Sequence, residues 1–205
     1  YLEIKKENGD AILFFRIGDF YEMFLDDARC ASRILGIALT SRDKSRDIPM
    51  CGVPYHAAAA YIAKLVKEGH KVAVCEQVTD PKDSKGIVER AVCRVITPGT
   101  ALEDELLEPR ANNFIASAHT GSGSCGFSYM DVSTGEFRIT EFSEKSALQD
   151  ELKRLRPLEL VVQEEMKDSF SSMEIGVKKL STLARYDFDY EVASGRLKDH
   201  FNPAS

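Results

Sequence analysis

An apolar stretch that runs straight into a turn constrains this chain more than any other feature. Residues 11–17 (AILFFRI) are apolar except for one arginine, and Gly18 and Asp19 follow at once. Glycine adopts backbone angles that other residues resist, and aspartate readily starts a turn or caps a helix. The stretch therefore predicts a strand over about 11–17 that ends in a tight turn.

Two aromatic residues and a carboxylate come directly after this turn. If residues 20–22 are extended, the side chains of Phe20 and Glu22 share a face and can point at one object, whereas in a helix they diverge by about 200°. We favour the extended conformation and treat Phe20 and Glu22 as a working pair. Tyr21 then lies on the opposite face, where packing is its expected role. The other phenylalanines of the run are expected core residues because Phe is so often buried: Phe14, Phe15 and Phe24.

Length and composition favour two domains. The 205 residues are 43% hydrophobic, which is enough to build real cores. A Pro-Gly-Thr corner at 98–100 and the acidic stretch after it indicate a boundary. Residues 1–100 hold 15 Lys and Arg against 14 Asp and Glu, and residues 101–205 hold 12 against 19, within a net charge of −6. A nucleic-acid contact would fit the first half better, although this balance decides nothing by itself.

The first half alternates strands and helices, which is typical of an α/β domain. Apolar residues recur at helical spacing after the first turn, and Gly36 provides a stop signal. We expect these elements in chain order: a short helix at 1–8, a strand at 11–17, a helix at 21–35, a strand at 37–40, a charged hairpin loop at 41–47, a turn at 52–56, a helix at 57–68, and strands at 71–77 and 89–97.

The second half follows a different pattern. Three strands are expected in quick succession at 113–118, 125–131 and 135–142. A helix at 145–155 and a buried strand at 158–162 follow them. Residues 131–135 form a tight hairpin connection between two of the strands. This order is the opening of a ribonuclease-H-like fold, so the prediction for the whole chain is a mixed-sheet α/β domain followed by a ribonuclease-H-like domain.

Several classes of site and location are disfavoured. Five cysteines, never in a CxxC pair and mostly in apolar stretches, are expected to be reduced core residues of a cytosolic protein. The four histidines show no metal-ligand spacing, so we expect no zinc site. No apolar run suits a bilayer span, and the start does not resemble a signal peptide. Because the chain starts without Met and ends in a polar stretch, we expect an excised fragment.

Several motifs in a fixed order carry a resemblance to a known family. The most specific are GDFYE at 18–22, IPMCGVPYH at 48–56, VAVCEQ at 72–77, RVITPGT at 94–100 and DVSTGEF at 131–137. The chain resembles the N-terminal part of the MutS family, the mismatch-recognition ATPases of DNA repair, over essentially all of its length. The resemblance implies a mismatch-recognition domain at 1–101, a linker at 102–112 and a connector domain, cut short, at 113–205.

The resemblance also implies roles for individual residues. Phe20 matches the family residue that wedges into the duplex from the minor groove and stacks on the mispaired base, and Glu22 matches the one that hydrogen-bonds that base. Wedges of this kind unstack and kink DNA. Arg42 corresponds to a basic position beside the DNA, and Lys44 and Arg46 are expected near phosphate. Each of these three is equally well explained as a solvated loop charge.

Partners and cofactors follow from the same resemblance. It implies that the protein binds double-stranded DNA with mismatches or small loops and contacts a MutL-type repair partner through the connector. It also implies that the full-length protein is a homodimer. The expected location is the bacterial cytoplasm, at the nucleoid and away from any membrane. ATP and Mg belong to the full-length protein. No GxxxxGK[ST] phosphate loop occurs in this sequence, so we expect no cofactor in this fragment and a binding module rather than an enzyme.

Two other functions stay open. A ribonuclease-H-like, metal-dependent nuclease needs several acidic residues that converge on two metal ions. Asp131 is the only carboxylate that ends a strand in a suggestive place, and Glu136 sits beyond the turn, so we rank this function below DNA recognition. The acidic second half could also serve purely as a protein-interaction module. For the fragment alone we expect weak, salt-sensitive DNA binding, because affinity for duplex rests largely on phosphate contacts.

Overall fold

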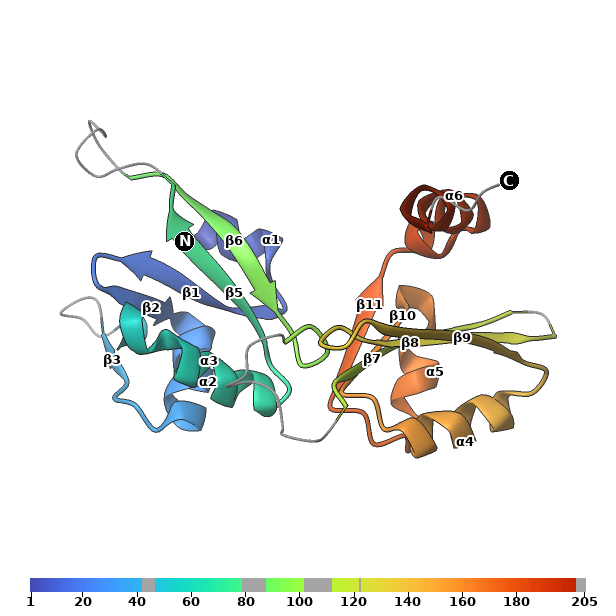
Figure 1. The fold of residues 1–205 in the computed structure, drawn as a ribbon. Coiled ribbons are helices and arrows are strands. Elements are labelled where there is room, and N and C mark those ends of the chain that lie inside the picture. Colours follow the sequence, from blue (N-terminus) through green and yellow to red (C-terminus); the bar gives the residue numbers. More distant parts are fainter. Residues whose placement is uncertain (42–46, 79–87, 102–111, 122, 202–205) are drawn as a thin grey trace. The chain divides into compact units, whose positions relative to one another are not determined.

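The computed structural model describes residues 1–41, 47–78, 88–101, 112–121 and 123–201. The chain divides into two compact units, Tyr1–Pro109 and Arg110–Ser205 (Figure 1). Each unit has its own mixed sheet and its own hydrophobic core, so the prediction of a mixed α/β fold is confirmed. Within the described residues, no helix combines the length and the apolar character needed to cross a bilayer.

The first unit is built on a six-stranded sheet in the order β3-β4-β2-β1-β5-β6. Strand β1 is antiparallel to its neighbour β2 and parallel to β5. The strands are β1 (Ala11–Ile17), β2 (Phe20–Phe24), β3 (Thr40–Ser41), β4 (Pro49–Pro54), β5 (Lys71–Gln77) and β6 (Arg90–Ile96). The helices are α1 (Leu2–Glu7), α2 (Leu25–Leu35), the 3-10 turn η1 (Tyr55–Ala57) and α3 (Ala58–Lys67).

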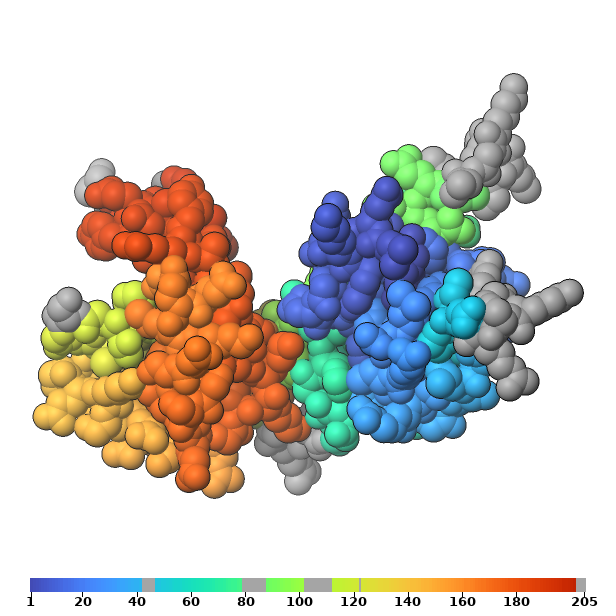
Figure 2. Space-filling view, turned by 180° about the vertical axis from the view of Figure 1, so that it is seen from behind, coloured from blue at the N-terminus to red at the C-terminus, as the bar shows by residue number. Residues whose placement is uncertain are grey.

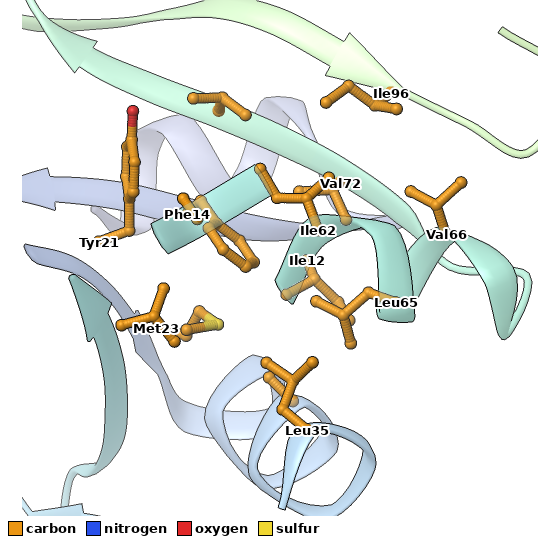
Figure 3. Packing of buried hydrophobic residues seen from close by; sticks show 14 of the residues in the cluster. Ile12, Phe14, Tyr21, Met23, Leu35, Ile62, Leu65, Val66, Val72 and Ile96 are labelled. Carbon is orange, nitrogen blue, oxygen red and sulfur yellow. The ribbon is translucent and has the colours of Figure 1, made fainter. Parts of the chain in front are cut away.

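The two faces of this sheet are covered differently. Alternate side chains of the strands point to one face, where α2 and α3 close a large core around Phe14, Met23 and Leu65 (Figure 3). The other alternate set, which includes Leu13 and Phe15, forms a smaller core with the N-terminal segment. Seen from behind, this segment lies at the surface in dark blue (Figure 2). Among the described residues, α1 and the residues beside it pack against one part of this second face.

A buried carboxylate fastens α1 to the sheet. Asp27 accepts hydrogen bonds from the Tyr1 hydroxyl at 2.8 Å, the Lys5 ammonium at 2.9 Å and the Leu13 backbone N–H at 3.0 Å. Burial, followed by the negative charge of Asp27, raises the pKa of Tyr1 above its usual range. Because a buried acid with three donors is well compensated, this cluster stabilises the junction of α1, α2 and β1.

The second unit contains a five-stranded sheet in the order β11-β10-β7-β8-β9. Strands β7, β8 and β9 are antiparallel, whereas β10 runs parallel to both β7 and β11, which matches the ribonuclease-H-like order. The strands are β7 (Phe114–Thr120), β8 (Cys125–Asp131), β9 (Glu136–Phe142), β10 (Glu159–Gln163) and β11 (Lys179–Leu183). The helical elements are α4 (Lys145–Leu155), η2 (Glu164–Met166), α5 (Lys167–Ser171), η3 (Arg185–Phe188) and α6 (Tyr190–Phe201).

Three sequence-based predictions were wrong in the first unit. The helix expected at 21–35 begins only at Leu25, because residues 20–24 pair with β4 and residues 20–22 also pair with β1. Leu25 has φ +55°, a left-handed conformation at the junction between strand and helix. The strand expected at 37–40 is limited to Thr40–Ser41, and the turn expected at 52–56 starts later because β4 continues to Pro54. The predicted linker at 102–112 lies outside the described residues except for residue 112.

Candidate nucleic-acid interface

A tight hairpin places Phe20 at the end of the first sheet. Strands β1 and β2 are joined by Gly18 and Asp19 alone, and Ile17 pairs with Phe20 across the turn. Gly18 has φ +56°, a left-handed conformation that a two-residue connection favours and glycine adopts without strain. The sequence therefore forms the turn locally, and the turn sets Phe20 at its tip.

The extended conformation of residues 20–22 is confirmed, and alternation separates the side chains of β2 by face. Phe20 is 47% exposed and Glu22 is half-buried, whereas Tyr21 and Met23 between and beyond them are buried in the α2–α3 core. Phe20 and Glu22 thus share the face that α1 covers only in part. The three phenylalanines assigned to the core are buried as predicted: Phe14, Phe15 and Phe24.

Strand β4 is the neighbour of β2 on the side of this pair, and it presents a glycine opposite Glu22. Phe20 lies opposite Pro54, and Glu22 lies opposite Gly52. A Cβ on Gly52 would lie 3.3 Å from the Tyr21 carbonyl oxygen and 3.6 Å from Cγ of Glu22. The lack of a side chain at this position keeps the surface beside Glu22 low. A flat aromatic ring next to a carboxylate can stack on a planar group and accept a hydrogen bond from its N–H.

A polar cluster holds the opposite side of the hairpin tip. The Arg16 Nε donates to the Gly18 carbonyl at 2.5 Å, and its guanidinium carbon lies 3.9 Å from the centroid of the Tyr55 ring. The Tyr55 backbone N–H donates to the Asp19 carbonyl at 2.9 Å. Arg16 also forms an ion pair with Glu76 at 3.9 Å, and Glu76 accepts a hydrogen bond from the hydroxyl of Tyr21.

Burial, followed by the hydrogen bond to Glu76, raises the pKa of Tyr21 to about 12. The phenol therefore remains a donor across the physiological range and keeps its bond to Glu76. The sequence placed Tyr55 only within the turn expected at 52–56, and it did not single out Arg16 or Glu76. One signal was present, because Arg16 is the single charged residue in an apolar strand.

The three basic candidates at Arg42, Lys44 and Arg46 lie outside the described residues. The hairpin loop predicted to carry them connects β3 to β4, and β4 is the direct neighbour of β2 in the sheet. Their contact with phosphate therefore stays a prediction.

Asp131, the residue that suggested a nuclease, lies inside the second unit. One of its oxygens accepts from the Asn113 N–H at 3.0 Å, and the other accepts from the N–H and hydroxyl of Ser133 at 2.9 and 2.5 Å. Burial pushes the pKa of Asp131 up, but the hydrogen bonds from Ser133 and Asn113 outweigh it and lower the pKa. Glu136 pairs with Arg138 at 3.0 Å. Asp131 is thus a structural carboxylate of the β8–β9 connection.

Most of the cysteines lie where the sequence predicted, with one exception. In the part of the chain that the structure describes, no group of three or more potential ligands is placed to hold a metal ion. All five cysteines are free thiols, and three of them are buried: Cys51, Cys75 and Cys125. Cys93 is exposed instead, because it lies on β6, at the edge of the sheet.

Comparison with known proteins matches both units. The family model of MutS domain I matches residues 1–105, and that of MutS domain II matches residues 113–205. The DNA mismatch repair protein MutS of Alkaliphilus oremlandii is 50% identical over 213 residues, which cover 98% of this chain and 24% of that protein. The protein of the same name from Thermodesulfovibrio yellowstonii is 47% identical over 207 residues, which cover 100% of this chain and 24% of the relative.

A third relative, the DNA mismatch repair protein MutS of Pelotomaculum thermopropionicum, is 55% identical over 166 residues, or 79% of this chain and 19% of its own length. The chain thus spans about a quarter of the length of the relatives it matches. Since the two family models together match nearly all of it, the chain belongs to the MutS family.

Proposed function

We propose that this chain is the part of a mismatch repair protein that recognises mispaired or looped duplex DNA. Phe20 enters the duplex from the minor groove and stacks on the mispaired base, and Glu22 accepts a hydrogen bond from that base. One observation carries the proposal: a phenylalanine that is 47% exposed stands at the tip of a two-residue hairpin, beside a carboxylate on the same face. Family membership supports it.

Recognition by insertion selects sites that deform easily. Prying a base step apart costs a few kcal/mol and kinks the duplex by roughly 20–90°. The cost falls where pairing and stacking are already faulty, so a mismatch opens more readily than an ordinary step. A phenyl ring suits this task because its face stacks on any base, for about 1–3 kcal/mol, without reading the base edge.

Glu22 contributes discrimination rather than affinity. A carboxylate close to phosphates is repelled by them, which penalises binding to ordinary duplex. A displaced base offers an N–H partner that a paired base does not. Gly52, the cross-strand neighbour of Glu22, adds no side chain beside the carboxylate. Glu22 therefore favours the mismatch by making the alternative worse.

Other partners belong to the complete protein in this proposal. Arg42, Lys44 and Arg46 contact phosphate next to the wedge, and the acidic second unit contacts a MutL-type repair partner. ATP, Mg and the homodimer contacts are assigned to regions of the relatives beyond the quarter that this chain spans, and the sequence lacks a GxxxxGK[ST] loop. No step of the recognition proposed here depends on ATP.

The test compares mismatch and homoduplex affinity for Phe20→Ala in the complete protein. Loss of stacking worth about 1–3 kcal/mol lowers the affinity ratio by roughly 5- to 150-fold while nonspecific binding persists. Phe137→Ala is the matched control, because Phe137 is also a phenylalanine on a strand and is 43% exposed, but lies in the second unit. An unchanged ratio for Phe20→Ala would refute the proposal.

A further inference from the structure

We propose that Arg16 is a positioning residue for Phe20. Arg16 holds the hairpin tip from the face opposite to the DNA contact, and it does not itself bind phosphate. The inference rests on the proposed function of Phe20. Nothing in the role of the Phe20 and Glu22 pair requires it, since Arg16 lies on a different strand and points to a different face.

The register places Arg16 away from the interface. Arg16 lies opposite Tyr21 on β2, so both side chains point to the α2–α3 face, whereas Phe20 and Glu22 point to the other. The Arg16 side chain is only 19% exposed. An arginine this well covered and already paired with Glu76 has little reach toward a phosphate on the far side of the sheet.

Three properties of the guanidinium are used at once. Its Nε donates along the strand to the Gly18 carbonyl, its flat face stacks on Tyr55, and its outer nitrogen faces Glu76. A planar fork with several donors can meet all three requirements, whereas a lysine ammonium supplies charge without the stacking plane or the fixed fork. The position therefore demands arginine for its shape and not for its charge alone.

The contacts converge on the two residues that precede Phe20. Arg16 binds the carbonyl of Gly18, and Tyr55, the residue on which Arg16 stacks, binds the carbonyl of Asp19. Tyr55 directly follows Pro54, the cross-strand partner of Phe20. The tip is thus fastened from β1 and from the start of η1, directly after β4.

A fastened tip matters because insertion is opposed by base stacking. Ordering a loose hairpin at the moment of binding costs conformational entropy, which subtracts from the stacking energy that Phe20 supplies. A tip that is already fixed in the free protein avoids that cost. Arg16 therefore acts on discrimination through Phe20, and its removal weakens the mismatch complex more than the nonspecific one.

The experiment uses the complete protein with Arg16→Lys and Arg16→Met, together with the Tyr55→Phe and Tyr55→Leu pair. We expect both Arg16 variants and Tyr55→Leu to lower the ratio of mismatch to homoduplex affinity by roughly 2- to 30-fold, the range of a cation–π contact. Tyr55→Phe keeps the ring and retains most of the ratio. Because Lys keeps the charge, a loss in Arg16→Lys identifies shape as the requirement.

Two further readouts separate positioning from other roles. Each phosphate contact contributes about 0.9 to the slope of log affinity against log salt concentration, so the slope of Arg16→Met stays at the wild-type value if Arg16 binds no phosphate. In a double-mutant cycle, Arg16→Met adds no further loss of ratio to Phe20→Ala, because its effect passes through that ring. A general loss of stability would instead lower both affinities in either background.

Three outcomes would overturn the inference: a salt slope reduced by about 0.9 in Arg16→Met, an unchanged ratio in Arg16→Lys, or an additive loss in the Phe20→Ala background. Should Arg16→Met fail to fold, the Tyr55 pair and Arg16→Lys carry the same comparison. An unchanged ratio in Phe20→Ala itself would refute the proposed function, and that result is distinct from all three.

Discussion

Two hairpin connections, of two residues between β1 and β2 and of four residues between β8 and β9, each contain a glycine at positive φ, but the residues beside them play different roles. The β1–β2 connection contains Gly18 at φ +56°, and the β8–β9 connection contains Gly135 at φ +77°. After the first turn the chain presents an aromatic ring outward, at Phe20. Before the second turn it directs a carboxylate inward, at Asp131, which is almost fully buried. Both residues suggested chemistry when only the sequence was considered.

The difference shows how surroundings decide what such a residue does. Asp131 accepts hydrogen bonds from Ser133 within its own connection and from Asn113 directly before β7, so it ties the β8–β9 connection to the neighbouring strand. Phe20 is half out of the protein and contributes little to the core, while a polar cluster beneath it holds the backbone. In the first hairpin Arg16 holds the backbone and the Phe20 ring stays available to a ligand. In the second hairpin Asp131 is itself one of the residues that stabilise the connection.

The largest expected effect is on stability, from Asp131→Ala. The buried N–H of Asn113 loses its acceptor, at roughly 1–3 kcal/mol, and the partly buried hydrogen bonds from Ser133 are lost as well. Urea unfolding followed in the second unit should register that loss, while Phe20→Ala changes the free energy of unfolding by less than about 0.5 kcal/mol, as for an exposed side chain. Equal losses for the two variants would erase the contrast between the hairpins.

The next largest effect is on discrimination, from Glu22→Ala in the complete protein. Removing the carboxylate abolishes repulsion from ordinary duplex and the hydrogen bond to the displaced base, which for a charged acceptor is worth about 1.5–3 kcal/mol. The ratio of mismatch to homoduplex affinity should therefore fall by roughly 10- to 100-fold. Glu136→Ala, at the corresponding side of the other hairpin, is the control and leaves the ratio in place.

A smaller effect is expected from matched glycine substitutions. Gly18→Ala and Gly135→Ala each place a Cβ in a left-handed conformation, for about 1–2 kcal/mol of destabilisation. Thermal unfolding should show comparable losses. Only Gly18→Ala should also reduce the preference for a mismatch, since it alone disturbs the tip beneath Phe20. A similar reduction by Gly135→Ala would argue against a local effect.

The smallest effect is a dependence on pH. Because the folded state lowers the pKa of Asp131 below its ordinary value of 3.8, this group contributes stability above that value and loses it as pH falls through the folded pKa. Acid titration of the unfolding free energy should therefore be shallower below pH 3.8 in Asp131→Asn than in the wild type. Parallel curves would mean that the pKa of Asp131 is the same in the folded and the unfolded state.

Local patterns predicted much of this fold. The strands at 11–17, 71–77 and 125–131 and the helix at 145–155 have the expected bounds. Strand periodicity also assigned Phe20 and Tyr21 to the correct faces. These features depend on neighbours in the chain, and the sequence displays such neighbours directly.

The features that were missed depend on distant partners. Residues 21–24 carry the apolar spacing of a helix, and their pairing with β4, about thirty residues later, makes them a strand instead. The cluster under the tip unites Arg16, Tyr55 and Glu76 from separate elements, which no local motif can reveal. Beyond residue 163, β11 is an edge strand and α6 has no buried residue, so neither gives a strong periodic signal.

The central claim is that the ring of Phe20 stacks on a mispaired base, and a fluorescent base at the mismatch tests it most directly. With 2-aminopurine in the mispaired position, binding of the complete wild-type protein should change the fluorescence, because the probe leaves its stack in the duplex for the phenyl ring. Phe20→Ala at saturating concentration should leave the signal near that of free DNA. An equal change with both proteins would contradict the account.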